Sequence, residues 1–254
     1  MMGVFTDRTG EETYNNFGSK MIITKYNNAH DMDVYFPEYG YTINHVTYNN
    51  FKKGRIKSPY EPRCYGKGYL GEGKYKISEN GKNTDEYNTW HGMLRRCYDP
   101  KLQEKYPTYK DCEVSTEWLN FQTFSHWYEN NYYEIPGEVM CLDKDILYKG
   151  NKIYSRSTCC FVPDRINSLF TKCDSHRGDL PIGVSEDHNK YRARCHNTES
   201  IIINLGTYVT PIKAFEVYKN FKEITIKKVA DKYKGMIPNN VYEALYNYQV
   251  EITD

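Results

Sequence analysis

The chain has 254 residues and a formal net charge of +1 at pH 7, and this length suits two or three modules of about 60 to 100 residues. Its 26 Tyr and 10 Phe can bury large areas, so we expect a folded chain despite a mean hydropathy of −0.81. The near-zero charge argues against attachment to nucleic acid by bulk electrostatics. Because the sequence has neither a run of about 18 apolar residues nor a basic-then-apolar leader, we expect no membrane span and no secretion signal.

The first part of the chain has the pattern of short strands. Runs rich in β-branched and aromatic residues occupy positions 21–26, 32–36 and 41–46, and polar turn segments separate them at 27–31 and 38–40. This spacing predicts a small β module over residues 1–58.

A basic stretch rich in tyrosine follows, with glycines at 66, 68, 71 and 73. Cations beside stacking rings are typical of a nucleic-acid contact, and we assign Lys52, Lys53, Arg55 and Lys57 to DNA binding. The alternative is a solvated, flexible linker over residues 59–80. The cations of the stretch are Lys52, Lys53, Arg55, Lys57, Arg63, Lys67, Lys74 and Lys76.

Two helices are predicted in the central part. Tyr87, Trp90, Leu94 and Cys97 recur at helical spacing, and a second helix is expected after Asn120, a residue type that favours the N-cap. The segment 142–162 then suggests a hairpin, with a further helix over 165–170 capped by Asp164.

The central motifs resemble the HNH-type nuclease-like proteins of bacteriophages. The resemblance lies in the segments 87–98, 112–119, Leu142-Asp143-Lys144-Asp145 and 158–162, and in Asn167. It implies a ββα-metal module with flanking helices over residues 81–175, in which Asp143 and Asn167 hold Mg²⁺ or a similar divalent cation against a DNA phosphate. Small β modules such as residues 1–58 accompany these regions in phage proteins.

Two positions depart from the family pattern. Lys144 stands where the family has a His that acts as general base, and Thr158 stands where it has an Asn that orients this His. An ammonium group with the ordinary pKa of about 10.4 stays protonated at neutral pH. A substitute base would be His91, His126 or a metal-bound hydroxide. In the purely structural alternative, Asp143 only flanks a turn at 149–151.

The eight cysteines include no Cys-x-x-Cys pair, which argues against a zinc ribbon. A dispersed zinc site from Cys97, Cys112 and Cys159 with a histidine is the alternative to reduced, buried thiols, the interpretation that we favour.

The C-terminal part has its own resemblance. Its motifs are Gly183-Val184, the segment 191–194, the segment 204–208 and Thr210-Pro211 with the helix-like run after it. They resemble the three-stranded, one-helix DNA-binding domain of plant ethylene-response factors, although the usual Trp of the strands is absent. Strand alternation places Arg192 and Arg194 on the face opposite Ala193, where they could enter a major groove. An ordinary ββα scaffold with solvated arginines is the alternative.

Together these features predict an α+β protein with a small β module (1–58), a basic linker (59–80), an HNH-like module (81–175) and a DNA-binding-like domain with a helical tail (176–254). We expect a phage-type protein that binds double-stranded DNA in the cytoplasm of a bacterial host. It is either a metal-dependent endonuclease with a weakened site, formed by Asp143, Lys144, Thr158 and Asn167, or an inactive binding protein. In the second case it occupies DNA or inhibits a host protein such as a defence enzyme.

Overall fold

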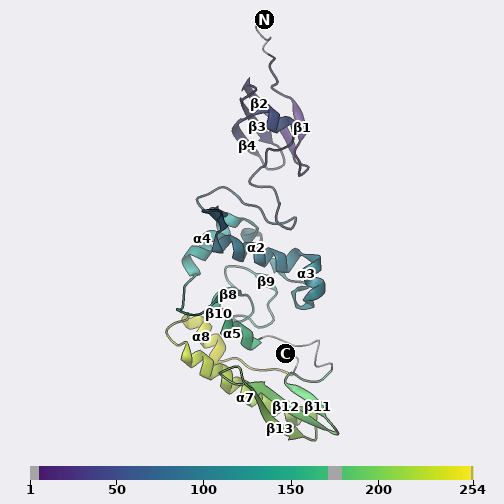
Figure 1. The fold of residues 1–254 in the computed structure, drawn as a ribbon, viewed down its shortest axis with the longest axis vertical. Coiled ribbons are helices and arrows are strands. Elements are labelled where there is room, and N and C mark those ends of the chain that lie inside the picture. The colour runs from purple at the N-terminus through teal and green to yellow at the C-terminus, as the bar shows by residue number, and fades with distance from the viewer. Residues whose placement is uncertain (1–5, 171–178, 253) are drawn as a thin grey trace. The chain divides into compact units, whose positions relative to one another are not determined.

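Helices and short strands in several separate sheets give the computed structural model an α+β architecture, as the sequence predicts (Figure 1). The structure describes residues 6–170, 179–252 and 254. The chain divides into two compact units: Met1–Asn130 with Ile153–Ser155 (unit 1), and Asn131–Lys152 with Arg156–Asp254 (unit 2). The boundary at 130/131 lies inside the expected module 81–175. Among the described residues, no helix is long and apolar enough to cross a membrane.

An antiparallel four-stranded sheet begins unit 1, in the order β1-β2-β3-β4. Its strands are β1 (Glu12–Tyr14), β2 (Lys20–Asn28), β3 (Asp31–Phe36) and β4 (Tyr41–Val46). Every second residue of β3 is buried, as expected of a strand with one face on a core. Phe51 of the short helix α1 (Tyr48–Lys52) packs into the same core. The three β-rich runs of the sequence are therefore strands.

Aromatic packing holds the helical part of unit 1 together. The Trp90 indole Nε1 donates a hydrogen bond to the Trp118 carbonyl O at 2.8 Å, so a fully buried ring also satisfies its polar atom. Asn120 accepts a hydrogen bond from the Gln122 N–H at 2.9 Å, which confirms the predicted cap. The elements are β5 (Ser78–Glu79), β6 (Lys82–Asn83), α2 (Asp85–Tyr98), α3 (Pro100–Lys105), η1 (Pro107–Tyr109), β7 (Glu113–Val114), η2 (Thr116–Leu119), α4 (Phe121–Asn131) and β9 (Ile153–Tyr154).

The expected flexible linker is instead packed structure. Residues Cys64 and Gly68 form a β-bridge, and Gly68 lies so close to Trp90 and Leu94 of α2 that a Cβ atom there would clash with both. The Tyr69 N–H donates to the Leu119 carbonyl O at 2.9 Å. The glycines of this stretch were misleading because glycine serves close packing as well as chain flexibility.

A hairpin and a short helix open the part of unit 2 that bears the HNH resemblance. The strands β8 (Met140–Asp143) and β10 (Cys160–Pro163) pair antiparallel, with Asp143 opposite Cys160. Helix α5 (Asp164–Asn167) follows, contacts both strands and continues as η3 (Ser168–Phe170). The expected cap is wrong: Pro163 is the N-cap and Asp164 is the first helical residue.

A three-stranded antiparallel sheet on a long helix forms the rest of unit 2. Strands β11 (Val184–Asp187), β12 (Lys190–His196) and β13 (Ile202–Tyr208) lie in this order. The helix α7 (Pro211–Lys232) contacts all three strands and α8 (Asn239–Tyr246). Thr210 caps α7 as predicted, because its Oγ1 accepts a hydrogen bond from the Lys213 N–H at 3.2 Å. Ala214 and Tyr218 are buried beneath the sheet.

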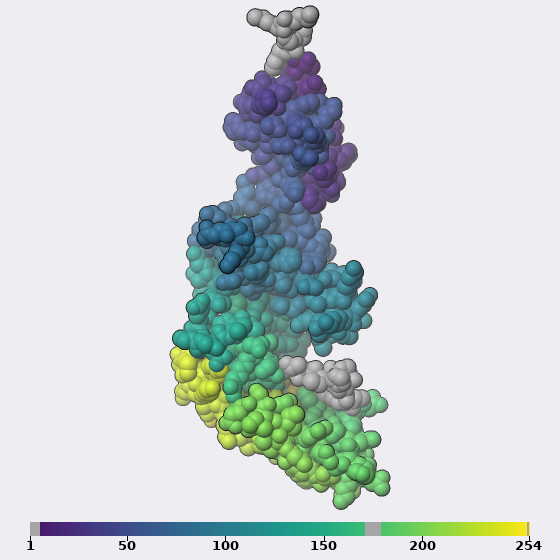
Figure 2. Space-filling model, viewed as in Figure 1, coloured from purple at the N-terminus to yellow at the C-terminus, as the bar shows by residue number. Residues whose placement is uncertain are grey.

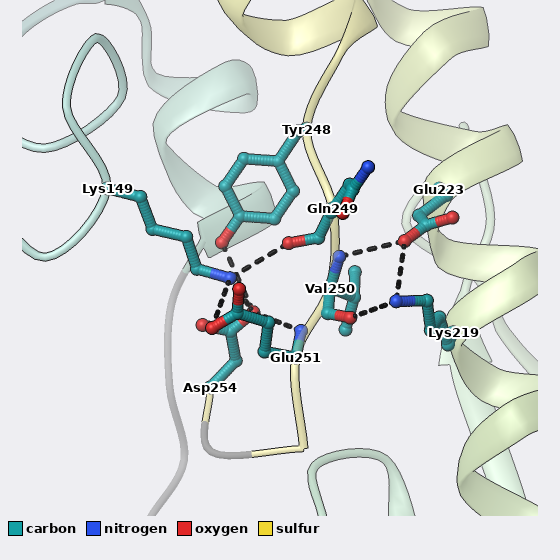
Figure 3. Close-up of polar contacts among 8 residues, drawn as sticks. All are labelled: Lys149, Lys219, Glu223, Tyr248, Gln249, Val250, Glu251 and Asp254. Atoms are coloured by element: carbon teal, nitrogen blue, oxygen red, sulfur yellow. Dashed lines mark hydrogen bonds and ion pairs between the residues drawn. The ribbon is translucent and has the colours of Figure 1, made fainter.

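The segment after α8 is held from two sides (Figure 3). Lys149, in the loop between β8 and β10, places its Nζ 2.8 Å from Oδ2 of Asp254 and 4.9 Å from the centre of the Tyr248 ring. From α7, the Lys219 Nζ donates to the Val250 carbonyl O at 2.7 Å. These contacts tie the segment to both the hairpin loop and the long helix of unit 2.

Candidate nucleic-acid interface and hairpin site

The outer face of the β11–β13 sheet carries the two arginines that the sequence assigns to DNA. Along β12, Ala193 and Cys195 are buried toward α7, whereas Arg192 and Arg194 project from the opposite face. The segment that contains these strands, drawn in green in Figure 2, forms part of the molecular surface. The structure thus places the half-buried Arg192 and the exposed Arg194 two residues apart on one face of a folded sheet.

The two arginines differ in their contacts. Arg192 donates from Nη2 and Nε to Oδ2 of Asp187, at 2.7 and 3.2 Å, and the Thr207 hydroxyl donates to the same oxygen at 3.3 Å. These bonds lower the pKa of the Asp187 carboxyl, above all the bond from Arg192. Arg194 is exposed and has a 3.3 Å hydrogen bond from Nη2 to the Ser185 Oγ. Arg192 is therefore an oriented guanidinium, and Arg194 is a more loosely held one.

The four cations assigned to DNA in unit 1 are all exposed. Arg55 and Lys57 alternate with the buried Ile56 and Ser58 in the segment after α1, whereas Lys53 lies in the turn at the end of this helix. The Lys52 Nζ lies 5.8 Å from the centre of the Tyr48 ring, and the Lys57 Nζ lies 5.0 Å from that of Phe17. The structure thus leaves all four cations exposed on unit 1, two of them over aromatic rings.

Several tyrosines and later cations of the same stretch are engaged within the fold. Tyr60 packs against Tyr41, with ring centroids 5.3 Å apart, and hydrogen-bonds Glu72 at 3.3 Å. The Lys74 Nζ lies 2.9 Å from a carboxylate oxygen of Glu129. These rings stabilise unit 1 internally, which weakens the sequence-based interpretation that they stack on bases.

Asp143 lies at the end of β8 and is 9% exposed. Its Oδ1 accepts hydrogen bonds from the N–H groups of Asp145 and Ile146 at 2.8 and 2.7 Å. Burial, reinforced by the neighbouring Asp145 charge, raises the pKa of Asp143 to about 6. Both bonds use Oδ1, so Oδ2 is the oxygen that a hard cation would take.

The remaining hairpin residues are an ion pair and two half-buried polar side chains. The Lys144 Nζ is 3.0 Å from Oδ2 of Asp145, and the Lys144 side chain is largely buried. Thr158 is half-buried in the loop before β10, and Asn167, also half-buried, is the last residue of α5. Asp143 thus lies on β8 and Asn167 on the helix α5 that contacts this strand.

The proposed substitute bases lie in unit 1, and the proposed zinc ligands are divided between the two units. His91 of α2 packs against Tyr65 and Tyr87, and burial together with Arg95 lowers its pKa. His126 is exposed on α4. Both are in unit 1, whereas Asp143 is in unit 2. Within the described part of the chain, no group of three or more His, Cys, Asp or Glu side chains is placed to hold a metal ion. Cys97, Cys112 and Cys159 are buried thiols.

Sequence reasoning missed Asp187. The available signal was the tight connection at positions 188–189, because it places residue 187 diagonally across the strand pair from Arg192.

No family model, curated protein or solved structure matches the chain.

Proposed function

We propose that this protein binds double-stranded DNA through the outer face of β11–β13. One observation carries the proposal: Arg192 and Arg194 project from a sheet whose other face is buried on α7. A rigid two-stranded ribbon or sheet can enter the major groove, where a guanidinium pairs with guanine. The exposed surface of Lys52, Lys53, Arg55 and Lys57 would add contacts to phosphates. The heavy use of Tyr, Asn, Lys and Ile is what AT-rich codons produce, which agrees with a gene of a phage from a low-GC bacterium. We propose that the protein acts in the cytoplasm of such a host.

Fluorescence anisotropy with a labelled duplex tests this proposal. We expect Arg192→Ala with Arg194→Ala to weaken binding at least about tenfold, since each good arginine–base contact is worth about 1 to 3 kcal/mol. The matched control replaces Lys227 and Lys228, two exposed cations of α7, and should have a smaller effect. Equal losses would indicate diffuse charge attraction. An intact protein without duplex binding would favour the alternative partner, a host protein.

A second candidate activity is DNA cleavage at the β8–β10 hairpin with Mg²⁺ or a similar cation. The order strand, strand, helix, with Asp143 on β8 and Asn167 on α5, favours it. A cation bound there would polarise a phosphate. Lys144, paired with Asp145, would contribute positive charge and would not act as a base.

Incubation of supercoiled plasmid with Mg²⁺ or Mn²⁺ tests the second candidate. A weakened site should nick the plasmid slowly, and Asp143→Ala should abolish the nicking because it removes the metal carboxylate. Asp164→Ala, which removes an exposed carboxylate of α5, is the matched control and should leave the rate unchanged. Plasmid that stays supercoiled with the unmodified protein would leave a DNA-occupying or host-inhibiting binding protein as the function.

A further inference from the structure

The contact between Asp187 and Arg192 uses one edge of the guanidinium and leaves another open. A guanidinium has five N–H donors in a fixed plane. Asp187 Oδ2 accepts one from Nε and one from Nη2. Among the described residues, both N–H groups of Nη1 and the second one of Nη2 have no partner. One N–H from each of these nitrogens forms the end-on fork that matches O6 and N7 of guanine. The carboxylate therefore holds Arg192 without occupying the donors that read a base.

Asp187 itself is fixed from several directions. It lies at the end of β11, next to the tight connection to β12, where His188 has a φ of 57°. The Thr207 hydroxyl of β13 donates to the oxygen that also accepts from Arg192, and Nδ1 of His188 lies 3.3 Å from the other carboxylate oxygen. A carboxylate that is held by groups on β13 and on the turn can fix the rotamer of an arginine on β12.

We propose that Asp187 is a positioning residue that orients Arg192 to read a base, whereas Arg194 supplies attraction to phosphate. This inference rests on the proposed function. It predicts that loss of the Asp187 side chain strengthens binding to DNA in general and weakens the discrimination between DNA sequences. Loss of Asp187 removes a negative charge from the DNA-facing side and should strengthen binding to any duplex. It also frees the Arg192 side chain, whose ordering then costs free energy on binding, and should reduce sequence discrimination.

The experiment first selects a preferred duplex for the full chain from a random-core DNA library. The measured quantity is the ratio of affinities for the selected duplex and a scrambled duplex of equal length. We expect this ratio to fall about fivefold or more in Asp187→Ala, equivalent to about 1 kcal/mol, the lower end for one base contact. Asp187→Asn keeps an acceptor for Arg192 and should lie between Asp187→Ala and the unmodified protein. In an Arg192→Ala background, Asp187→Ala should no longer change the ratio.

The matched control is Glu186→Ala. Glu186 is the exposed neighbour on β11, and strand alternation directs it away from the outer face. Its loss removes the same charge but should leave the ratio unchanged. A ratio that is unaffected by Asp187→Ala, or that falls equally in Glu186→Ala, would overturn the inference while duplex binding survives. Selection without any enriched sequence would also overturn it. Absence of duplex binding by the unmodified protein would overturn both this inference and the proposed function.

Discussion

At the scale of single residues, Asp143 combines a structural and a chemical role. Its Oδ1 accepts two backbone N–H groups at the end of β8, which stabilises the start of the loop toward β10. The same burial raises its pKa to about 6, well above the ordinary value for an aspartate. The carboxylate thus stabilises the turn through its hydrogen bonds, but its ionised form is destabilised by the loss of water around it.

This cost predicts a pH dependence of stability. The folded state binds the Asp143 proton more tightly than the unfolded state, so the free energy of unfolding should fall as the pH rises from about 4 to about 6. Asp143→Asn keeps an oxygen for both N–H donors but has no charge. We expect it to stabilise unit 2 at pH 7.5 by about 1 to 3 kcal/mol and to remove this part of the pH dependence.

Urea unfolding followed by far-UV circular dichroism at pH 5 and pH 7.5 measures this effect. Asp164→Asn, at an exposed position on α5, is the control and should change stability by only a few tenths of a kcal/mol. A destabilised Asp143→Asn variant at pH 7.5 would show that the charge itself stabilises the hairpin.

At the scale of elements, the bridge between residues 64 and 68 shows how a glycine-rich stretch becomes part of a core. Gly68 lies against Trp90 and Leu94 of α2, and the backbone of Tyr69 bonds to residues 119 and 121 on either side of Asn120. A side chain at position 68 would force these rings and methyl groups apart. The absence of a Cβ atom therefore lets the segment 64–69 reach the helix.

Replacing Gly68 with Ala should destabilise unit 1 by about 1 to 3 kcal/mol, because an added methyl group overpacks a well-filled core. All three tryptophans are in unit 1, so urea unfolding followed by tryptophan fluorescence reports on this unit alone. A Cβ atom added at Gly92 of α2 would meet only Nη1 of Arg96, at an ordinary contact distance of 3.9 Å. Gly92→Ala is the control with the opposite sign and should stabilise by about 0.5 to 1 kcal/mol. Stabilisation by both changes would refute the close packing at Gly68.

At the scale of the whole molecule, contacts remote in sequence determine where each unit begins and ends. The chain leaves unit 2 after Lys152, contributes β9 to unit 1 in a parallel pair with β7, and returns to unit 2 at Arg156. In unit 2, Lys149 holds the segment after α8 through Asp254, more than a hundred residues along the chain. Local sequence patterns carry no information on such pairings, because either partner alone has many acceptable neighbours.

The sequence by itself determined the features that depend on local periodicity and capping. Spacings of two or 3.6 residues predict the strands of residues 21–46, the helix around Trp90 and the outward direction of Arg192. Side chains that bond the nearby backbone predict the caps at Asn120 and Thr210. Only the tertiary structure decided that Gly68, Gly71 and Gly73 serve packing and that Lys144 pairs with Asp145. The contact between Asp187 and Arg192 is likewise visible only in the tertiary structure. These outcomes depend on which residues meet across strands and helices, because packing and ion pairing act between residues that are distant in sequence.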